Sequence, residues 1–265
     1  MSDKLLGIPS IYYLNLDSEV DRRNYMEKQF EKWNLTKVKR FSGSNYLVEN
    51  YDEWKGVLHF SEQIKERKHQ LSASITLSTL EMVRHWLEST DEDHLILFED
   101  DYDLDLIEHW HFDWKYLMNK IPYDWDCVQL GYESCYHIKF FLHPKDITSA
   151  YGPILINRHF AQKLINLHYI KEKYMLIRKY GSHPYNTGYR VVSLDDFICF
   201  LGKTYQLPLI TQNPHLDKVP KKHHFLCRDM YYDWWQNRRD NFSLDDFFSY
   251  GKPNDYEMTE KVDYR

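Results

Sequence analysis

The sequence lacks the motifs that would place it in several large functional classes. It contains no Gly-x-Gly-x-x-Gly and no Gly-x-x-x-x-Gly-Lys-Ser/Thr pattern, so neither a dinucleotide-binding turn nor a P-loop is indicated. Gly-x-Ser-x-Gly and His-Glu-x-x-His are also absent, which leaves an α/β-hydrolase or a zinc-metalloprotease reading without support. The chain has no internal repeat and no low-complexity segment, and its 265 residues suit one domain with extensions.

Cysteine and long apolar runs are scarce. The four cysteines, Cys127, Cys135, Cys199 and Cys227, include no pair with Cys-x-x-Cys spacing, which predicts reduced thiols in a reducing compartment. The opening MSDKLLGIPS has no apolar stretch long enough for a signal peptide, and no later run has the length of a membrane-spanning helix. We therefore expect a cytoplasmic location.

Positive charge is also in deficit, whereas aromatic residues are abundant. Lys and Arg number 34 against 40 Asp and Glu, and the net charge of -6 argues against a general nucleic-acid binder. Aromatic residues make up 17% of the chain, with 22 Tyr and 8 Trp. Because this exceeds what a core usually takes, we expect some of these rings to line a cleft, an acceptor site or a homodimer surface.

The first half of the sequence has the pattern of an α/β fold. A strand is predicted over residues 10–16, a helix over 21–33 and a second strand over 38–41, an order that favours a parallel sheet. A helix is then predicted over 72–88 and a short apolar strand over 94–98.

The rest of the chain continues this alternation until the composition changes after Pro220. Predicted helices cover 106–120 and 158–169, and predicted strands cover 125–130, 154–156 and 205–210. We predict one domain over 1–218, with a mostly parallel sheet flanked by helices. An aromatic and acidic extension over 219–265 would pack on or near it.

The strand predicted over 94–98 leads directly into a cluster of carboxylates. Glu99, Asp100 and Asp101 follow it, and Asp103 comes two residues later. Open α/β sheets bind ligands at the carboxyl ends of their strands, and Mg²⁺ or Mn²⁺ prefers oxygen ligands such as clustered carboxylates. Glu99 and Asp101 are the candidate metal ligands, with Asp103 a further one. The alternative is a solvated acidic turn.

A second carboxylate pair and a group of histidines are further candidates. Asp195 and Asp196 follow an apolar run, so one of them is a candidate general base, although a helix N-cap is the alternative. Among the late histidines, His215 is a candidate for completing the metal coordination, and a surface position is its alternative.

Taken in order, these segments resemble glycosyltransferase family 25, which includes bacterial lipopolysaccharide glycosyltransferases and the collagen galactosyltransferases. The likeness covers about residues 10–213. It is carried by an Asn-Leu-Asp turn with paired arginines (12–23), a helix before the acidic motif (72–86), the Glu-Asp-Asp strand end (96–101), a Tyr-strand-Arg-helix segment (151–164), Asp-Asp-Phe (194–197) and Tyr-x-x-Pro-x-x-x-Gln (205–212). The chain departs from the family at Ser78-Thr79, where Ser-His is usual, and at Ala73-Ser74-Ile75, where glycine and cysteine are common.

The resemblance implies a GT-A type, Rossmann-like fold and an inverting transfer of a hexose from a UDP-sugar to a hydroxyl of a glycan, glycolipid or protein. It implies Mn²⁺ (or Mg²⁺) held by Glu99 and Asp101, with Asp103 and His215 as further ligands. Asp195 would be the catalytic base, with Asp196 the second choice.

The resemblance also implies a site for the nucleotide. Asn15, Asp17 and Arg23 follow the first strand and would contact the base and ribose, and Gln212 would lie near the donor.

Two other functions stay open at this point. One is a metal-dependent phosphoesterase that uses both carboxylate pairs, and the other is a non-catalytic binding protein on the same scaffold.

Overall fold

The computed structural model describes residues 3–43, 58–59, 67–134, 137–145, 152–176, 194, 198–218, 221–241, 243–249 and 259–261. Within them, a central sheet has the strand order β2-β1-β4-β9-β6-β12-β8. Its strands are β1 (Ser10–Asn15), β2 (Val38–Ser42), β4 (His94–Phe98), β6 (Cys127–Gln129), β8 (His143–Pro144), β9 (Ile154–Asn157) and β12 (Thr204–Gln206). Five of these seven strands run in one direction, and β8 and β9 run against them. The α/β class predicted from the sequence is confirmed.

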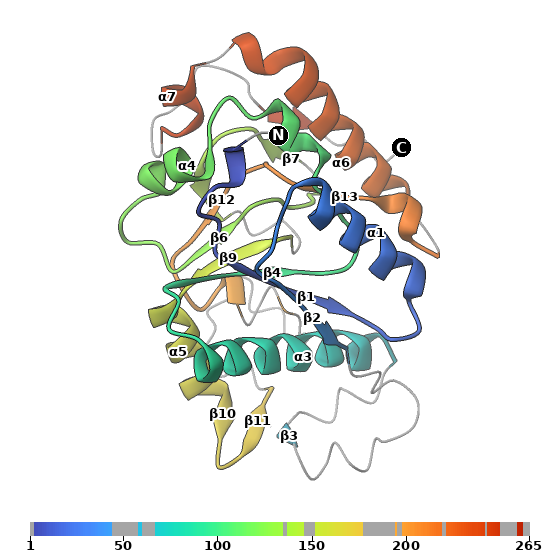
Figure 1. Ribbon diagram of the computed structural model, residues 1–265, viewed down its shortest axis with the longest axis vertical. Helices are drawn as coiled ribbons and strands as arrows, with labels where there is room; N and C mark the ends of the chain where they lie inside the picture. The colour runs from blue at the N-terminus through green and yellow to red at the C-terminus, as the bar shows by residue number, and fades with distance from the viewer. Residues whose placement is uncertain are drawn as a thin grey trace.

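Helices cover both faces of this sheet (Figure 1). On one face lie α3 (Arg67–Ser89) and α5 (Arg158–His168), and on the other lie α1 (Val20–Lys32), α4 (Trp114–Lys120), α6 (Lys222–Asp233) and α7 (Leu244–Phe247). The buried side chains form two clusters that correspond to these faces. The molecule is therefore a three-layer α/β/α arrangement.

The alternation of side chains along the strands explains why the sheet is central. In β1, Ile11 and Tyr13 pack with α1 and α6, whereas Tyr12 packs on the α3 side. In β4, Ile96 and Phe98 face the first cluster, and Leu95 and Leu97 face the second. Successive side chains of a strand point to opposite faces, so a continuous apolar run forms a strand that is buried on both sides.

Smaller ladders lie outside the central sheet. The two-stranded ladder of β5 (Tyr102–Asp103) and β13 (Thr211–Gln212) is antiparallel and pairs Gln212 with Tyr102. This ladder places residues 211–212 beside the acidic segment, although they lie more than 100 positions later in the sequence. The other short strands are β3 (Leu58–His59), β7 (His137–Lys139), β10 (Tyr169–Ile170), β11 (Lys173–Met175) and β14 (Thr259–Lys261).

One predicted helix is wrong. In place of a single helix over 106–120, the chain forms a 3₁₀ turn at Asp105–His109, an extended Trp110 and then α4. The break has a local cause, because the Asp113 side chain accepts a hydrogen bond from the Tyr116 amide and starts a new helix there. Trp110 and Phe112 are thereby buried on the α1 face of the sheet.

The segment after residue 218 contributes to the same core. Tyr231, Trp234, Trp235 and Phe247 are buried in the cluster that also contains Ile11 and Phe98 of the central strands. No helix in the described part of the chain combines the length and apolar character needed to cross a membrane.

Candidate active site

The site is built where two neighbouring parallel strands end. β1 and β4 are paired, so Asn15 at the end of β1 lies beside the residues that follow Phe98 of β4. Asn15 Nδ2 donates a hydrogen bond of 2.7 Å to Asp100 Oδ2, and both residues are buried. The end of the first strand and the acidic motif thus meet at the carboxyl edge of the sheet, where open α/β sheets bind ligands.

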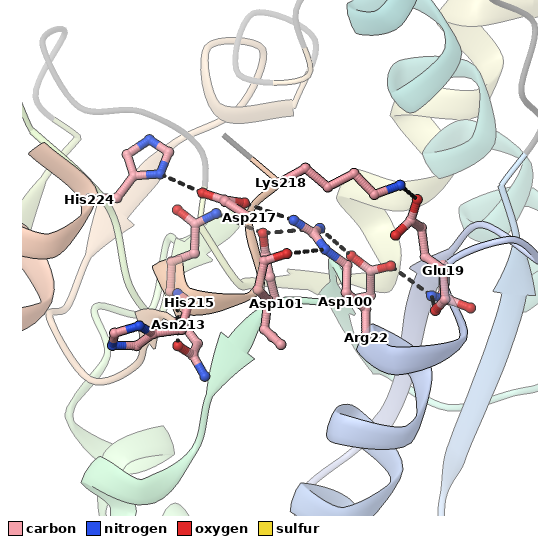
Figure 2. Close-up of polar contacts among 12 residues, drawn as sticks. Glu19, Arg22, Asp100, Asp101, Asn213, His215, Asp217, Lys218 and His224 are labelled. Carbon is pink, nitrogen blue, oxygen red and sulfur yellow. Dashed lines mark hydrogen bonds and ion pairs between the residues drawn. The ribbon is translucent and has the colours of Figure 1, made fainter. Parts of the chain in front are cut away.

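Arg22, in the first turn of α1, donates hydrogen bonds to three carboxylates (Figure 2). Its Nη1 donates to Asp100 Oδ1 at 2.8 Å and to Asp101 Oδ2 at 3.4 Å, and its Nη2 donates to Asp217 Oδ1 at 2.7 Å. Burial acts to lower the pKa of Arg22, but the three carboxylates outweigh it and raise the pKa overall. The guanidinium thus neutralises acidic groups from two distant parts of the sequence.

Asp101 has one oxygen engaged and one available. Its Oδ2 accepts a hydrogen bond of 2.6 Å from Gln212 Nε2, which the β5–β13 ladder places beside the neighbouring Tyr102. Burial raises the pKa of Asp101 to about 6, against the opposing effects of Arg22 and Gln212. No group in the described part of the chain donates to the buried Oδ1. A buried, unsatisfied carboxylate oxygen is a suitable ligand for a divalent cation, so Asp101 fits the metal that the sequence predicts.

Two adjoining cavities meet at Glu99, which lines both. The first, of about 310 Å³, includes Asp100, and the second, of about 240 Å³, includes Asp101. The first cavity lies between the end of β1 and the helix α3, and its other walls include Asn15, Leu16, Ser74, Ile75 and Lys218. The second lies below the β5–β13 ladder, and its other walls include Tyr132, Glu133, Gly152, Thr211 and His224.

A row of three polar side chains begins at the wall of the second cavity. It consists of Glu133, His224 and Asp217. His224 Nδ1 donates to Asp217 Oδ2 at 3.0 Å, and His224 Nε2 lies 3.4 Å from Glu133 Oε2. Burial raises the pKa of Glu133 to about 8, and the negative charges of Asp101 and Asp217 add to this effect. Asp217 therefore connects this row of side chains to Arg22 and the acidic cluster.

Asp17 and Arg23, two predicted nucleotide contacts, lie apart from this cluster. Asp17 is tied to β2, because its carboxylate accepts hydrogen bonds from Arg40 at 2.6 Å and from Ser42 at 2.8 Å. These contacts lower the pKa of Asp17, and the charge of Arg23 adds a smaller effect in the same direction. Neither residue is among those that line the first cavity.

Asp103, a predicted metal ligand, is fully buried with both oxygens engaged. Its Oδ1 accepts a hydrogen bond from the Asp105 amide at 2.9 Å. Its Oδ2 accepts hydrogen bonds from Arg228 at 3.0 Å and from Tyr232 at 2.7 Å, both on α6. Asp103 thus anchors α6 and is not among the residues that line either cavity.

The structure does not bring His215 to the metal candidates. It is exposed, its ring packs edge-on against Phe225 with centroids 5.1 Å apart, and in Figure 2 it is turned away from Asp101. Asp195 and Asp196, the predicted bases, lie outside the described residues. Of the predicted set, Asn15, Glu99, Asp101 and Gln212 lie at one site.

Sequence reasoning chose Arg23 and missed Arg22. The helical period holds a signal that separates them, because the buried residues Met26 and Gln29 lie four and seven positions after Arg22. Arg22 is therefore nearer the centre of the buried face of α1. Glu133 and Asp217 were missed for another reason, since each is a single polar residue with no motif around it.

Comparison with known proteins adds little to this geometry. No protein-family model matches the sequence, and no curated protein matches it. Among solved structures, a chain described as A197 from STIV is similar to 82% of this chain over its own full length. The sequence identity is 14% and the TM-score is 0.41, and a likeness at this level supports no inference about function.

Proposed function

We propose that this chain is a metal-dependent, inverting glycosyltransferase of GT-A type that moves a hexose from a nucleotide-diphosphate sugar, such as a UDP-sugar, to a hydroxyl acceptor. The observation that carries the proposal is the acidic edge at the end of β4, where Asp100 faces one cavity, Asp101 faces another and Glu99 lines both. Two adjoining cavities suit a transfer reaction, because donor and acceptor must be held next to each other in the right orientation.

The first cavity has the character of a nucleotide site. Leu14, Leu16 and Ile75 offer an apolar wall for a base. Arg22 and Lys218 line the same cavity, each already paired with carboxylates, and would contact a phosphate by exchanging those partners. Ser74 Oγ is buried, and no partner for it occurs among the described residues. A ribose or base could satisfy this hydroxyl, so its position supports a polar ligand in the cavity.

The cation belongs between the two cavities. Asp101 Oδ1 would bind it, with Glu99 as the second protein ligand and phosphate oxygens completing the set. Bound there, Mn²⁺ or Mg²⁺ would stabilise the leaving nucleoside diphosphate. Asp103 and His215 are not part of this proposal, because their contacts direct them elsewhere.

The second cavity would receive the acceptor. Gln212 and Thr211 supply polar groups there, and Tyr132 supplies an aromatic wall suited to a sugar ring. Asp195 remains the proposed base, with Asp196 the second choice, in a segment outside the described residues. A base on this side of the sugar would remove the proton from the attacking hydroxyl.

A thermal-shift comparison tests donor binding directly. Unfolding midpoints would be measured with UDP, GDP and their hexose conjugates, each with and without Mn²⁺. We expect one nucleotide to raise the midpoint only with the metal, by roughly 5 °C at about 100 times its dissociation constant. Asp101→Asn keeps the shape of the side chain, accepts the Gln212 hydrogen bond and removes the charge, so it should abolish the metal-dependent shift and the release of nucleoside diphosphate.

The matched control is Asp124→Asn, at an aspartate that precedes β6 at the opposite edge of the sheet and pairs with Lys203. It should leave the nucleotide response unchanged. If no nucleotide shifts the wild-type midpoint with Mn²⁺, or if Asp101→Asn responds like wild type, the proposed function is wrong.

A further inference from the structure

We infer that Glu133, His223 and His224 form a binding site for a late first-row divalent metal ion, most simply Zn²⁺, separate from the nucleotide-associated cation. One ligand atom from each residue lies within 4.8 Å of the other two. The three residues come from two segments, since Glu133 follows β6 and the histidines open α6. The inference does not depend on nucleotide binding or on sugar transfer.

The distances fit a tetrahedral ion. Ligand atoms about 2.0–2.1 Å from a Zn²⁺ ion at tetrahedral angles lie roughly 3.3 Å from one another. His224 Nε2 and Glu133 Oε2 are 3.4 Å apart, which already matches. The two imidazole rings lie edge to face with centroids 4.3 Å apart, and a ring nitrogen of His223 lies within 4.8 Å of the other two ligand atoms, so the ring must move closer to complete the set.

The tautomer of His224 is fixed in the form that binds metal. Its Nδ1 is 3.0 Å from Asp217 Oδ2, and a carboxylate can only accept this hydrogen bond. A proton therefore resides on Nδ1, and in the neutral ring the lone pair is on Nε2, 3.4 Å from Glu133 Oε2. A carboxylate behind a histidine ligand is the usual second partner in zinc sites, because it orients the ring and increases its basicity. Figure 2 shows this His224–Asp217 contact.

The surrounding charge favours a cation. Glu133 is mostly buried, and the negative charges of Asp101 and Asp217 act on it more strongly than the positive charge of Lys221. Arg22 is already shared among Asp100, Asp101 and Asp217. An ion at this site would supply Glu133 with a direct positive partner.

The three ligands indicate which ion the site would bind and which coordination position they leave unfilled. Two imidazoles with one carboxylate suit zinc and its neighbours better than Mg²⁺, which prefers oxygen ligands. Three protein ligands leave the fourth tetrahedral position for water or a ligand oxygen. Glu133 and His224 line the second cavity, so this position faces the space that also contains Asp101.

Cobalt provides a direct probe, because Co²⁺ replaces Zn²⁺ and absorbs visible light when it is bound by imidazole in a tetrahedral site. The full chain, stripped with a chelator, would be titrated with Co²⁺ and then with Zn²⁺ as a competitor. We expect a visible spectrum that saturates at one equivalent and disappears when Zn²⁺ is added. Glu133→Gln and His223→Asn should each weaken binding by about tenfold or more.

His224→Asn is the sharpest variant. The Asn amide can still donate to Asp217 where Nδ1 did, but the nitrogen that would bind metal is gone, so the spectrum should be lost with little change in fold. Asp217→Asn should weaken binding by about tenfold through the orientation of His224. His159→Asn, at an exposed histidine on α5, is the control and should bind like wild type.

The failure of this inference is distinguishable from failure of the proposed function. Asp101→Asn should retain the cobalt spectrum even where it loses the nucleotide response. Circular dichroism of each metal-free variant establishes that it is folded, and the half-exposed His223 serves where a buried change prevents folding. A wild-type chain that binds no cobalt, or Glu133→Gln and His223→Asn variants that bind it as wild type does, would overturn the inference.

Discussion

At the scale of single residues, Arg22 is the partly buried cation that pairs with the three carboxylates of the candidate site. Its contacts with Asp100, Asp101 and Asp217 span 2.7 to 3.4 Å, and only 20% of its side chain is exposed. Three carboxylates this close would repel one another without a cation. The guanidinium and a divalent cation would both reduce the repulsion among these carboxylates. When the guanidinium is removed, the cation should therefore contribute more to the stability of the protein.

We predict that Arg22→Gln destabilises the metal-free protein by about 3–5 kcal/mol, because it leaves buried carboxylates without their partner. Mn²⁺ should restore part of this loss, so the metal should raise the unfolding midpoint more in the variant than in wild type. Urea unfolding with and without Mn²⁺ measures both effects. Arg23→Gln, one position along α1, is the matched control and should change little. Equal stability of the two variants, or an equal gain from Mn²⁺ in Arg22→Gln and wild type, would contradict this account.

At the scale of elements, α6 joins the acidic segment to the core. Arg228 and Tyr232, one turn apart, both contact Asp103. The adjacent face of the helix buries Tyr231, whose hydroxyl donates to the Tyr132 carbonyl oxygen at 2.9 Å. The first turn of the same helix carries His223 and His224. One helix thus sets the positions of both the β5 segment and the second cavity.

Tyr232→Phe should therefore destabilise the protein by about 1.5–3 kcal/mol, the usual value of a hydrogen bond to a charged group. The 2.7 Å bond to Asp103 is lost while the ring packing is kept. Burial and the nearby Asp103 raise the pKa of Tyr232, so its hydroxyl stays protonated and donates throughout the ordinary pH range. Chemical denaturation at neutral pH gives the measurement. Tyr123→Phe, at a fully exposed tyrosine, should have no effect, and a similar loss in both variants would count against the role given to Asp103.

The elements also show what sequence patterns can and cannot specify. Strands β1, β2 and β4 and helices α1 and α5 lie within a residue or two of their predicted positions, because apolar periodicity marks them without help from the rest of the chain. The helix predicted over 106–120 failed where a tertiary demand, the burial of Trp110, combined with a local cap at Asp113. Periodicity alone cannot detect such a break.

The candidate site divides in the same way. Glu99 and Asp101 were placed at the sheet edge by the strand before them, whereas Asn15 and Gln212 were suggested by the family resemblance. The structure brings all four close together. The pairing of Asp217 with both Arg22 and His224 depends on tertiary contacts across up to 195 positions, for which the sequence holds no local signal. The contacts of Asp103 could not be foreseen either, because its partners on α6 lie 125 or more positions away.

At the scale of the whole molecule, the core does not end where the predicted domain ends. Tyr231, Trp234, Trp235 and Phe247 fill the layer on the α1 face of the sheet, and the Trp235 indole donates a hydrogen bond of 2.7 Å to the Pro208 carbonyl oxygen. Full burial of a large apolar side chain contributes about 1.5–3 kcal/mol, so these four contribute roughly 6–12 kcal/mol. The whole free energy of unfolding of a domain is typically about 5–15 kcal/mol.

A chain that ends at residue 218 should therefore fail to fold cooperatively, because its loss is comparable with its entire stability. Near-ultraviolet circular dichroism during a urea titration would show a broad, shallow change in place of a sigmoidal transition. A chain that ends at Ser249 is the matched control, since it keeps α6 and α7 and loses only β14 among the described elements. It should unfold in a single steep transition. If the 218-residue chain unfolds as steeply, then the aromatic layer covers a core that is already complete, and the two-segment division inferred from composition describes the molecule better than the shared core does.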